Sequence, residues 1–210
     1  MTYPPPPWTI QGFGLLNVHL LDVDRVRSVI PAELQIIPVF PGKTVGGVFV
    51  ASYGLDSVMP YNELIVVSGL VAYKGKVGPW ISHIYVDHPD SVAGGRDIWG
   101  LPKELAEFEW TLTGQPQVQV RQDDRPLCHL TAHWRSPSLP TPPIAAPVIS
   151  KLRTDPVVFT ASGSLNLQLA GVTLDVPPAS PFASLELGQG WLSFYSDRLS
   201  VVVAAPSKIH

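Results

Sequence analysis

Apolar and polar residues alternate along many short segments of the chain, and a period of two indicates β-strands with one buried face. The alternation is clear in VQVRQ (118–122) and CHLTAHW (128–134). Proline and glycine, with 23 and 17 residues, separate these segments and do not gather in one linker. The pattern predicts strands near 13–21, 46–54, 63–73, 79–86, 105–113, 116–122, 127–134, 157–170, 183–195 and 198–204.

Three other segments predict connections. A short polar stretch near Tyr195–Leu199 predicts a hairpin between the last two strands. The proline-rich segment SPSLPTPPIAAP (136–147) predicts a long loop, and PPPP (4–7) predicts a stiff extended arm.

Two segments are predicted to be helical. In LDVDRVRSVIP (21–31), apolar residues recur at helical spacing, and the final proline ends the helix. In VDHPDSVAGGRDIWG (86–100), Asp87 or His88 can cap a helix that begins at Pro89, and two adjacent glycines keep it short. The predicted fold is therefore mainly β with two short helices, arranged as a barrel or a strongly curved sheet.

Composition narrows the possible functions. The 210 residues suffice for one sizeable core, so residues 1–210 are predicted to form a single domain with a proline-rich N-terminal arm. Charged residues make up 15% of the chain, against roughly 25% in typical soluble domains, which predicts a homo-oligomer with surface buried between subunits. The net charge is −3 without any basic run, so nucleic acid is not expected as a partner.

Sequence signals for membranes and cofactors are absent. No apolar stretch approaches the about 20 residues of a membrane-spanning helix, and the N-terminus does not resemble a signal peptide, so we expect a cytoplasmic protein without membrane contact. His129 and His133 lie in a strand pattern, and neither CxxC nor HExxH occurs. GFGLLN (12–17) lacks the third glycine of a dinucleotide fingerprint. We therefore expect neither a metal nor an organic cofactor.

The candidate for chemistry is Lys103 in GGRDIWGLPKELAEF (94–108). Its flanking residues are mainly apolar, and apolar surroundings disfavour the charged form of a lysine amine. A neutral amine can attack a ketone and form a Schiff base, whose protonated imine is an electron sink. A solvated lysine at a strand end is the alternative.

This region also carries a resemblance. GGRDIWGLPKELA (94–106) is similar to the signature of the acetoacetate decarboxylase superfamily, in which a Gly-Arg-Glu segment precedes an aromatic residue, a proline and the Schiff-base lysine. PYNELIVVSGLVAY (60–73) resembles the family's Tyr-x-Glu strand. Residues 22–36 resemble its first helix, and residues 78–97 resemble the strand and helix before the signature. The resemblance covers most of residues 8–113.

The resemblance implies a cone-shaped β-barrel that forms oligomers and acts on a small keto acid or another carbonyl compound. It places the Schiff-base lysine at Lys103 and an acid/base or positioning carboxylate at Glu63. For Glu63, a solvated carboxylate at a strand end is the alternative.

Five further residues are candidates for substrate binding. Arg96 either contacts substrate or forms an ion pair with Asp97 that holds the helix. His83 aligns with an apolar pocket position of the family and should share a face with Ile81 and Tyr85; a satisfied or surface histidine is the alternative. The predicted apolar pocket walls are Phe49, Trp99 and Leu101.

The chain departs from the family's decarboxylases at three places. Glu104 follows Lys103 where the decarboxylases have a second lysine, and acetoacetate decarboxylase is itself the standard example of a lysine activated by a neighbouring cation or by desolvation. The segment TIQGF (9–13) lacks their arginine, and GGVFVASY (46–53) lacks a further acidic residue. Compared with the decarboxylases, the chain lacks cationic groups that would hold the carboxylate of a β-keto acid, so aldolase or dehydratase chemistry on another keto acid is an alternative to decarboxylation.

Three hypotheses follow. In the first, the protein is a lyase whose Lys103 forms a Schiff base with a keto acid or ketone, assisted by Glu63. In the second, it is a non-catalytic barrel that retains the lysine and binds a hydrophobic or carbonyl-bearing small molecule. In the third, Lys103 is solvated and the signature serves folding alone.

Overall fold

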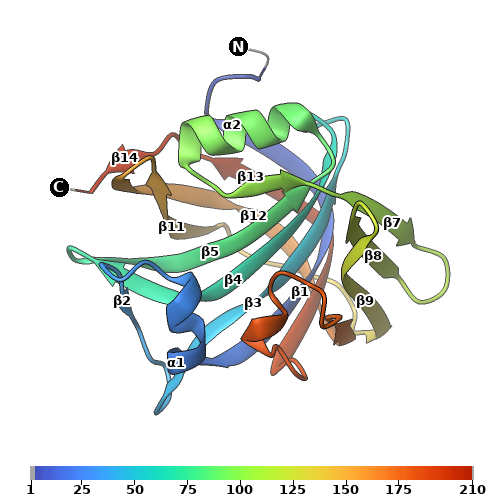
Figure 1. Cartoon of the computed structure of the whole chain (residues 1–210). Coiled ribbons are helices and arrows are strands. Elements are labelled where there is room, and N and C mark those ends of the chain that lie inside the picture. Colours follow the sequence, from blue (N-terminus) through green and yellow to red (C-terminus); the bar gives the residue numbers. More distant parts are fainter. Residues whose placement is uncertain (1–2, 210) are drawn as a thin grey trace.

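The protein has a mainly β fold with two short α-helices in residues 3–209, the part of the chain that the computed structural model describes (Figure 1). This confirms the predicted fold class. The helices are α1 (Val23–Val26) and α2 (Pro89–Trp99), with 3₁₀ turns at Arg27–Val29 and Ala183–Leu185. The strands are β1 (Trp8–Asp22), β2 (Gln35–Ile36), β3 (Lys43–Tyr53), β4 (Tyr61–Tyr73), β5 (Lys76–Val86), β6 (Lys103–Leu105), β7 (Glu107–Thr111), β8 (Gln117–Gln122), β9 (Arg125–Arg135), β10 (Leu139–Pro140), β11 (Ile144–Leu152), β12 (Asp155–Asp175), β13 (Leu192–Val203) and β14 (Ser207–Lys208).

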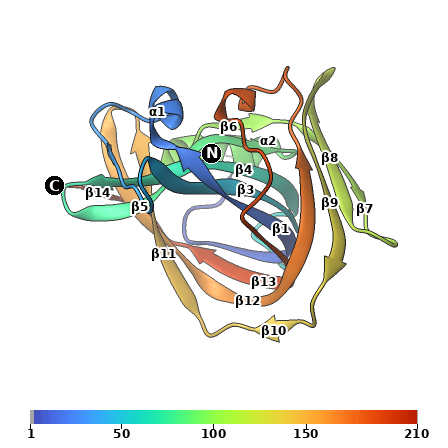
Figure 2. The same cartoon turned by 90° about the horizontal axis from the view of Figure 1, so that it is seen from below.

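Seven strands close into a barrel. They pair in the order β11-β5-β4-β3-β1-β13-β12, and β12 pairs back to β11. Figure 2 shows this ring from below. The long strand β12 continues past the ring to pair with β9, so β9, β8 and β7 extend the sheet beside the barrel (Figure 1).

Strand alternation sorts the buried side chains into two apolar clusters, as the period of two predicts. The outward cluster joins β1, β3 and β4 to α1, to the 3₁₀ turn at Ala183–Leu185 and to β8 and β9. The inward cluster draws residues from all seven strands of the ring and from the end of α2. Its buried members are Trp8, Ile10, Ala51, Tyr53, Met59, Tyr61, Ile81, Ile84, Val86, Trp99, Leu101, Val148, Phe159 and Leu199.

Helix α2 lies across one end of the barrel and delivers the chain to β6 (Figure 1). The side chain of His88 caps it by accepting a hydrogen bond from the Asp90 amide, and Pro89 occupies the first turn, as predicted. The helix ends at Gly100, whose φ of 64° is left-handed and suits glycine. The chain then enters β6, which runs parallel to β5 and places Lys103 beside Ile84.

One predicted strand and two predicted connections are wrong. Residues 183–195 do not form a strand, because a 3₁₀ turn and a loop occupy most of this segment and β13 begins at Leu192. The hairpin near Tyr195–Leu199 is absent, since β13 continues unbroken to Val203. The segment 136–147 is not one long loop, because it contains β10 and the first residues of β11.

Bulges explain the continuous course of β13. The ladder between β13 and β12 shifts register at Asn166/Leu167, and the ladder between β13 and β1 shifts between Gly12 and Gly14. A bulge accommodates an extra residue without ending the strand. The polar residues near position 197 therefore mark an irregular point inside a strand and not a turn.

Candidate active site

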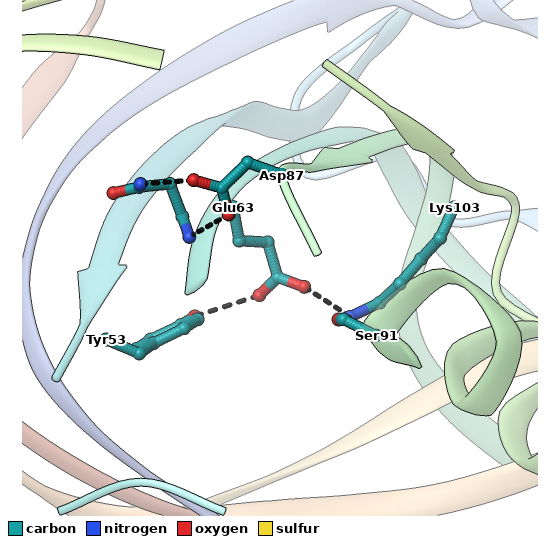
Figure 3. Close-up of polar contacts among 6 residues, drawn as sticks. Tyr53, Glu63, Asp87, Ser91 and Lys103 are labelled. Atoms are coloured by element: carbon teal, nitrogen blue, oxygen red, sulfur yellow. Dashed lines mark hydrogen bonds and ion pairs between the residues drawn. The ribbon is translucent and has the colours of Figure 1, made fainter. Parts of the chain in front are cut away.

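Lys103 opens β6 and points into the barrel, where its amine is buried. The residue is 3% exposed. Its Nζ donates hydrogen bonds to Glu63 Oε1 at 2.7 Å and to Ser91 Oγ at 3.0 Å (Figure 3). The amine is thus held between a carboxylate from β4 and a hydroxyl from α2, and Lys103 is not a solvated residue at a strand end.

Glu63 is equally enclosed, with 4% of its surface exposed. Its second oxygen, Oε2, accepts a hydrogen bond of 2.8 Å from the Tyr53 hydroxyl on β3 (Figure 3). Burial, together with the neighbouring Glu63 charge, raises the pKa of Tyr53 well above its usual value, so this phenol stays protonated as a donor. Tyr53, Glu63 and Lys103 therefore form one hydrogen-bonded chain across the inward face.

Aromatic rings surround the amine. Lys103 Nζ lies 5.0 Å from the ring centre of Tyr61 and 5.9 Å from that of Trp8. Both distances allow a cation–π attraction to the protonated amine. Burial also raises the pKa of Tyr61 well above its usual value, so Tyr61 remains neutral and Glu63 supplies the negative charge beside the amine.

The glycine at position 95 makes room for the lysine stem. A Cβ atom at this position would lie 2.5 Å from Lys103 Cδ, closer than van der Waals contact permits. At the neighbouring Gly94, a Cβ would instead lie 2.6 Å from the Trp8 ring. The two glycines lower the helix propensity of α2, but they allow the helix to approach Lys103 and Trp8.

Arg96 and Asp97 are exposed residues of α2, and each makes a hydrogen bond to a neighbouring segment. Arg96 is exposed, and its Nε donates a hydrogen bond of 2.7 Å to the backbone oxygen of Lys103. Asp97 accepts a hydrogen bond of 2.7 Å from the Tyr3 hydroxyl of the proline-rich arm. The two residues therefore hold β6 and the arm against α2 through separate partners, and the predicted ion pair between them is not the contact that either one makes.

The predicted apolar walls lie on the inward side. Trp99 and Leu101 are buried in the inward cluster, and Phe49 packs against it with partial exposure. The Trp99 indole donates a hydrogen bond of 2.8 Å to the Ala204 carbonyl and meets Trp8 edge-on at 4.8 Å between ring centres. These contacts hold Trp99, the last residue of α2, against the inward cluster.

His83 does not share a face with Ile81, contrary to the prediction. The β4–β5 ladder pairs His83 with Val66 and Ile81 with Val67, so Ser82 is an extra residue in β5. Ile81 therefore joins the inward cluster, while His83 turns outward and lies 5.7 Å from the Phe182 ring. Burial lowers the pKa of His83, and Glu104 partly opposes this. The side chains of His83 and Lys103 therefore lie on opposite faces of the sheet.

Glu104 points away from the amine, as the alternation of a strand predicts. It is exposed and accepts a hydrogen bond of 2.7 Å from Gln122 on β8. The acidic neighbour of Lys103 in the sequence is therefore not its partner in the fold.

Asp87 lies in the turn before α2 and accepts hydrogen bonds from the backbone and side chain of Asn62 (Figure 3). These bonds anchor the turn to β4.

Sequence reasoning missed three residues of this site: Tyr53, Ser91 and Trp8. Tyr53 shares strand parity with Phe49, which is a usable signal, although parity alone does not reveal a hydrogen bond to Glu63. Ser91 lies four residues before Gly95, so both fall on one helix face of small residues. Trp8 reaches the amine only because the N-terminal strand closes the ring.

The site lies in a region that is shared with a known family. The family model described as acetoacetate decarboxylase matches residues 1–158. The chain belongs to the acetoacetate decarboxylase family. The matched region contains α2, β6 and the strands that carry Tyr53 and Glu63.

Two named proteins are similar in sequence to this chain. Protein NEOXANTHIN-DEFICIENT 1 of Solanum lycopersicum is 34% identical over 115 residues, which cover 55% of this chain and 39% of that protein. The acetoacetate decarboxylase of Ralstonia nicotianae is 30% identical over 122 residues, which cover 58% of this chain and 44% of the enzyme. The matches thus span less than half the length of these relatives.

Solved structures share the fold of this family member. The acetoacetate decarboxylase of Legionella pneumophila superposes with a TM-score of 0.76 at 17% identity, covering 100% of this chain and 90% of that one. The enduracididine biosynthesis enzyme MppR, solved in complex with pyruvate, gives a TM-score of 0.71 at 14% identity, covering 99% and 91%. At these identities the likeness establishes the fold.

Membrane-spanning helices and clusters of metal ligands are both absent from the described residues. Among residues 3–209, no helix is long and apolar enough to cross a membrane. In the same residues, no group of three or more His, Cys, Asp or Glu side chains converges as a set of metal ligands.

Proposed function

We propose that the protein is a lyase of the acetoacetate decarboxylase type, in which Lys103 forms a Schiff base with a small keto acid or ketone. The observation that carries the proposal is the buried contact of 2.7 Å between Lys103 Nζ and Glu63 Oε1. A primary amine enclosed by apolar residues, with a carboxylate in hydrogen-bonding reach, has the two groups that imine chemistry needs.

Glu63 is the base that receives a proton from the lysine amine. The freed Nζ attacks the carbonyl carbon, and the carbonyl oxygen leaves as water after it has been protonated. The resulting protonated imine draws electrons from an adjacent bond, which breaks to leave an enamine. Tyr53 holds Glu63 through Oε2 while Oε1 faces the amine, so the carboxylate keeps one orientation.

Family membership supports this chemistry, and so does the MppR structure, which was solved with a keto acid, pyruvate. The bond that breaks is a separate matter. Glu104 stands where the decarboxylases have a second lysine, and its side chain points outward. The proposal therefore includes two kinds of reaction: decarboxylation, and aldolase or dehydratase chemistry.

Borohydride trapping tests the proposal. The protein is incubated with acetoacetate or pyruvate and reduced, and peptide mass spectrometry locates the adduct. We expect one adduct on Lys103, none in Lys103→Arg, and an unchanged adduct in Lys151→Arg, because Lys151 is a surface residue paired with Glu33. Failure of every carbonyl compound to label Lys103, beside an active control enzyme, would overturn the proposal.

A second candidate is a non-catalytic barrel that binds a small carbonyl-bearing or hydrophobic molecule. It is favoured by the saturation of the site, since Lys103 Nζ and both Glu63 oxygens already have partners within the protein. A ligand that co-purifies with the protein, without turnover and without a trapped adduct, would select this candidate.

We also expect the protein to assemble as a homo-oligomer. Large apolar side chains stand exposed on its surface, including Leu55 at 90%, Leu139 at 68% and Trp191 at 60%. Together with the low charge content, they suit burial against a second copy. Light scattering at several concentrations checks this, and a monomer throughout would contradict it.

A further inference from the structure

Charge inside the barrel is balanced by one pair. Within residues 3–209, Lys103 and Glu63 are the buried members of the Asp, Glu, Lys and Arg side chains. They neutralise each other across 2.7 Å. A charged group brought in by a ligand would therefore need a partner that the pair does not provide.

The surroundings of the pair supply hydroxyl groups and apolar surface but, among the described residues, no further buried positive charge. Tyr53 already donates to Glu63, and Ser91 already accepts from Lys103. The inward cluster is otherwise apolar, and the partly buried side chains of Phe49, Ile65 and Leu165 that pack against it are apolar too.

The guanidinium closest to Lys103 in the sequence cannot fill this role from its present position. Arg96 is exposed on the outer side of α2, and its Nε is bound to the Lys103 backbone oxygen. It lines a surface pocket with Tyr3 and Asp97, on the other side of the helix from the amine.

We infer that the site takes a neutral, apolar aldehyde or ketone and discriminates against keto acids; this rests on the Schiff base proposed above. The protonated imine carries the same single positive charge as the lysine ammonium, so it remains balanced by Glu63. A keto acid adds a carboxylate that would be buried without a counter-charge, and such burial is strongly unfavourable.

The chemistry balances for a neutral substrate. The lysine ammonium and the carbonyl compound give the protonated imine and one water, with no change in net charge. Glu63 then takes a proton either from an adjacent C–H bond or from the hydroxyl of a β-hydroxy ketone. The electrons of the broken C–H or C–C bond move into the imine and form the enamine, as in an aldol-type reaction.

A matched pair of ligands tests the inference. In 2-heptanone a methyl group replaces the carboxylate of 2-oxoheptanoate. Each compound is trapped on the protein with borohydride, and labelling of Lys103 is divided by labelling of Nα-acetyl-lysine amide under the same conditions. We expect this corrected labelling to favour the ketone by about tenfold or more, because the acid buries an unpaired charge.

A pair of variants at one inward position sharpens the test. Phe49→Arg adds a cation on the face that carries Glu63, whereas Phe49→Met keeps that position neutral. We expect Phe49→Arg to raise corrected labelling by 2-oxoheptanoate relative to 2-heptanone more than Phe49→Met does, because both variants remove the aromatic ring but only the arginine adds a counter-charge.

The possible outcomes are distinguishable. Corrected labelling of the unaltered protein that is equal for both compounds, or higher with 2-oxoheptanoate, overturns the inference and leaves the proposed Schiff base standing. Labelling of Lys103 by neither compound, nor by pyruvate and acetoacetate, overturns the Schiff base itself.

Discussion

Glu63 and Lys103 are 40 positions apart in the sequence, yet their side chains form a buried ion pair of 2.7 Å inside the barrel. Two elements bring them together. Strand β4 directs Glu63 inward, and β6 docks parallel to β5 so that Lys103 enters beside Ile84. Desolvation opposes the burial of both charges, so each residue depends on the other.

Removing one member of this pair should destabilise the protein more than removing both. Lys103→Met leaves Glu63 buried without its cation, and we expect the free energy of unfolding to fall by about 3 kcal/mol. In the double variant Lys103→Met/Glu63→Leu, much of this loss should be recovered. Urea denaturation measures both, and a double variant no more stable than the single one would contradict the coupling.

The hydroxyl of Tyr53 should matter to the reaction through Glu63. In Tyr53→Phe, Glu63 Oε2 loses its donor at 2.8 Å, so the carboxylate is less firmly oriented toward the amine. We expect the rate of adduct formation on Lys103 to fall and the free energy of unfolding to drop by about 1 kcal/mol. Time-resolved trapping and urea denaturation give the two quantities.

Tyr73→Phe is the control for this substitution, because Tyr73 lies at the far end of β4 with a ring that Lys74 covers. It removes the same hydroxyl group from a tyrosine outside the site. Equal rates for Tyr53→Phe and the unaltered protein would remove Tyr53 from the mechanism.

Gly95 should be more sensitive to alanine than helix propensity suggests. Alanine normally favours a helix by about 1 kcal/mol over glycine. A Cβ at position 95, however, would lie 2.5 Å from Lys103 Cδ and displace the lysine stem. We expect Gly95→Ala to lose most adduct formation on Lys103, as measured by trapping.

The neighbouring position provides the comparison. In Gly94→Ala the new methyl group meets the Trp8 ring and not the lysine. We expect this variant to retain more adduct formation than Gly95→Ala. The assignment of Gly95 to the lysine stem fails if both variants trap ligand equally well.

The sequence allowed prediction of the fold class and singled out Lys103 and Glu63 as candidates, without predicting their contact. Alternation reports a half-buried sheet directly, so most strands were predicted near their observed positions. The helix α2 followed from Pro89 and its preceding cap. The placement of Lys103 and Glu63 came from the family resemblance, because a spacing of 40 residues carries no information about contact.

The errors have two physical origins, a proline inside a strand and bulges that shift strand register. Pro147 lies within β11, which composition assigned to a loop. Proline is tolerated there because the β-ladder between β11 and β5 consists of one residue pair, Ile149 with Trp80, so few ladder hydrogen bonds are needed on that side. In β5, the extra residue Ser82 places His83 on the face opposite to that of Ile81, whereas simple alternation would place both on one face. Such bulges have no reliable sequence signal, and one residue of shift turns a side chain to the other face.

Buried His19 should make stability depend on pH. It is 3% exposed, its Nε2 has no hydrogen-bond partner among the described residues, and burial lowers its pKa from 6.5 to about 4. Between these two values the unfolded chain binds a proton that the folded protein does not. The free energy of unfolding should therefore fall as pH decreases from 6.5 to about 4, by about 3 kcal/mol in total from this residue.

The variant His19→Leu isolates this contribution, since leucine fills the buried space without titrating. Above pH 7 both proteins carry a neutral side chain at this position. Between pH 6.5 and 4 the unaltered protein should lose more stability than His19→Leu, and urea denaturation at a series of pH values measures the difference. Parallel pH profiles for the two proteins would show that His19 becomes protonated in the folded state as readily as in the unfolded chain.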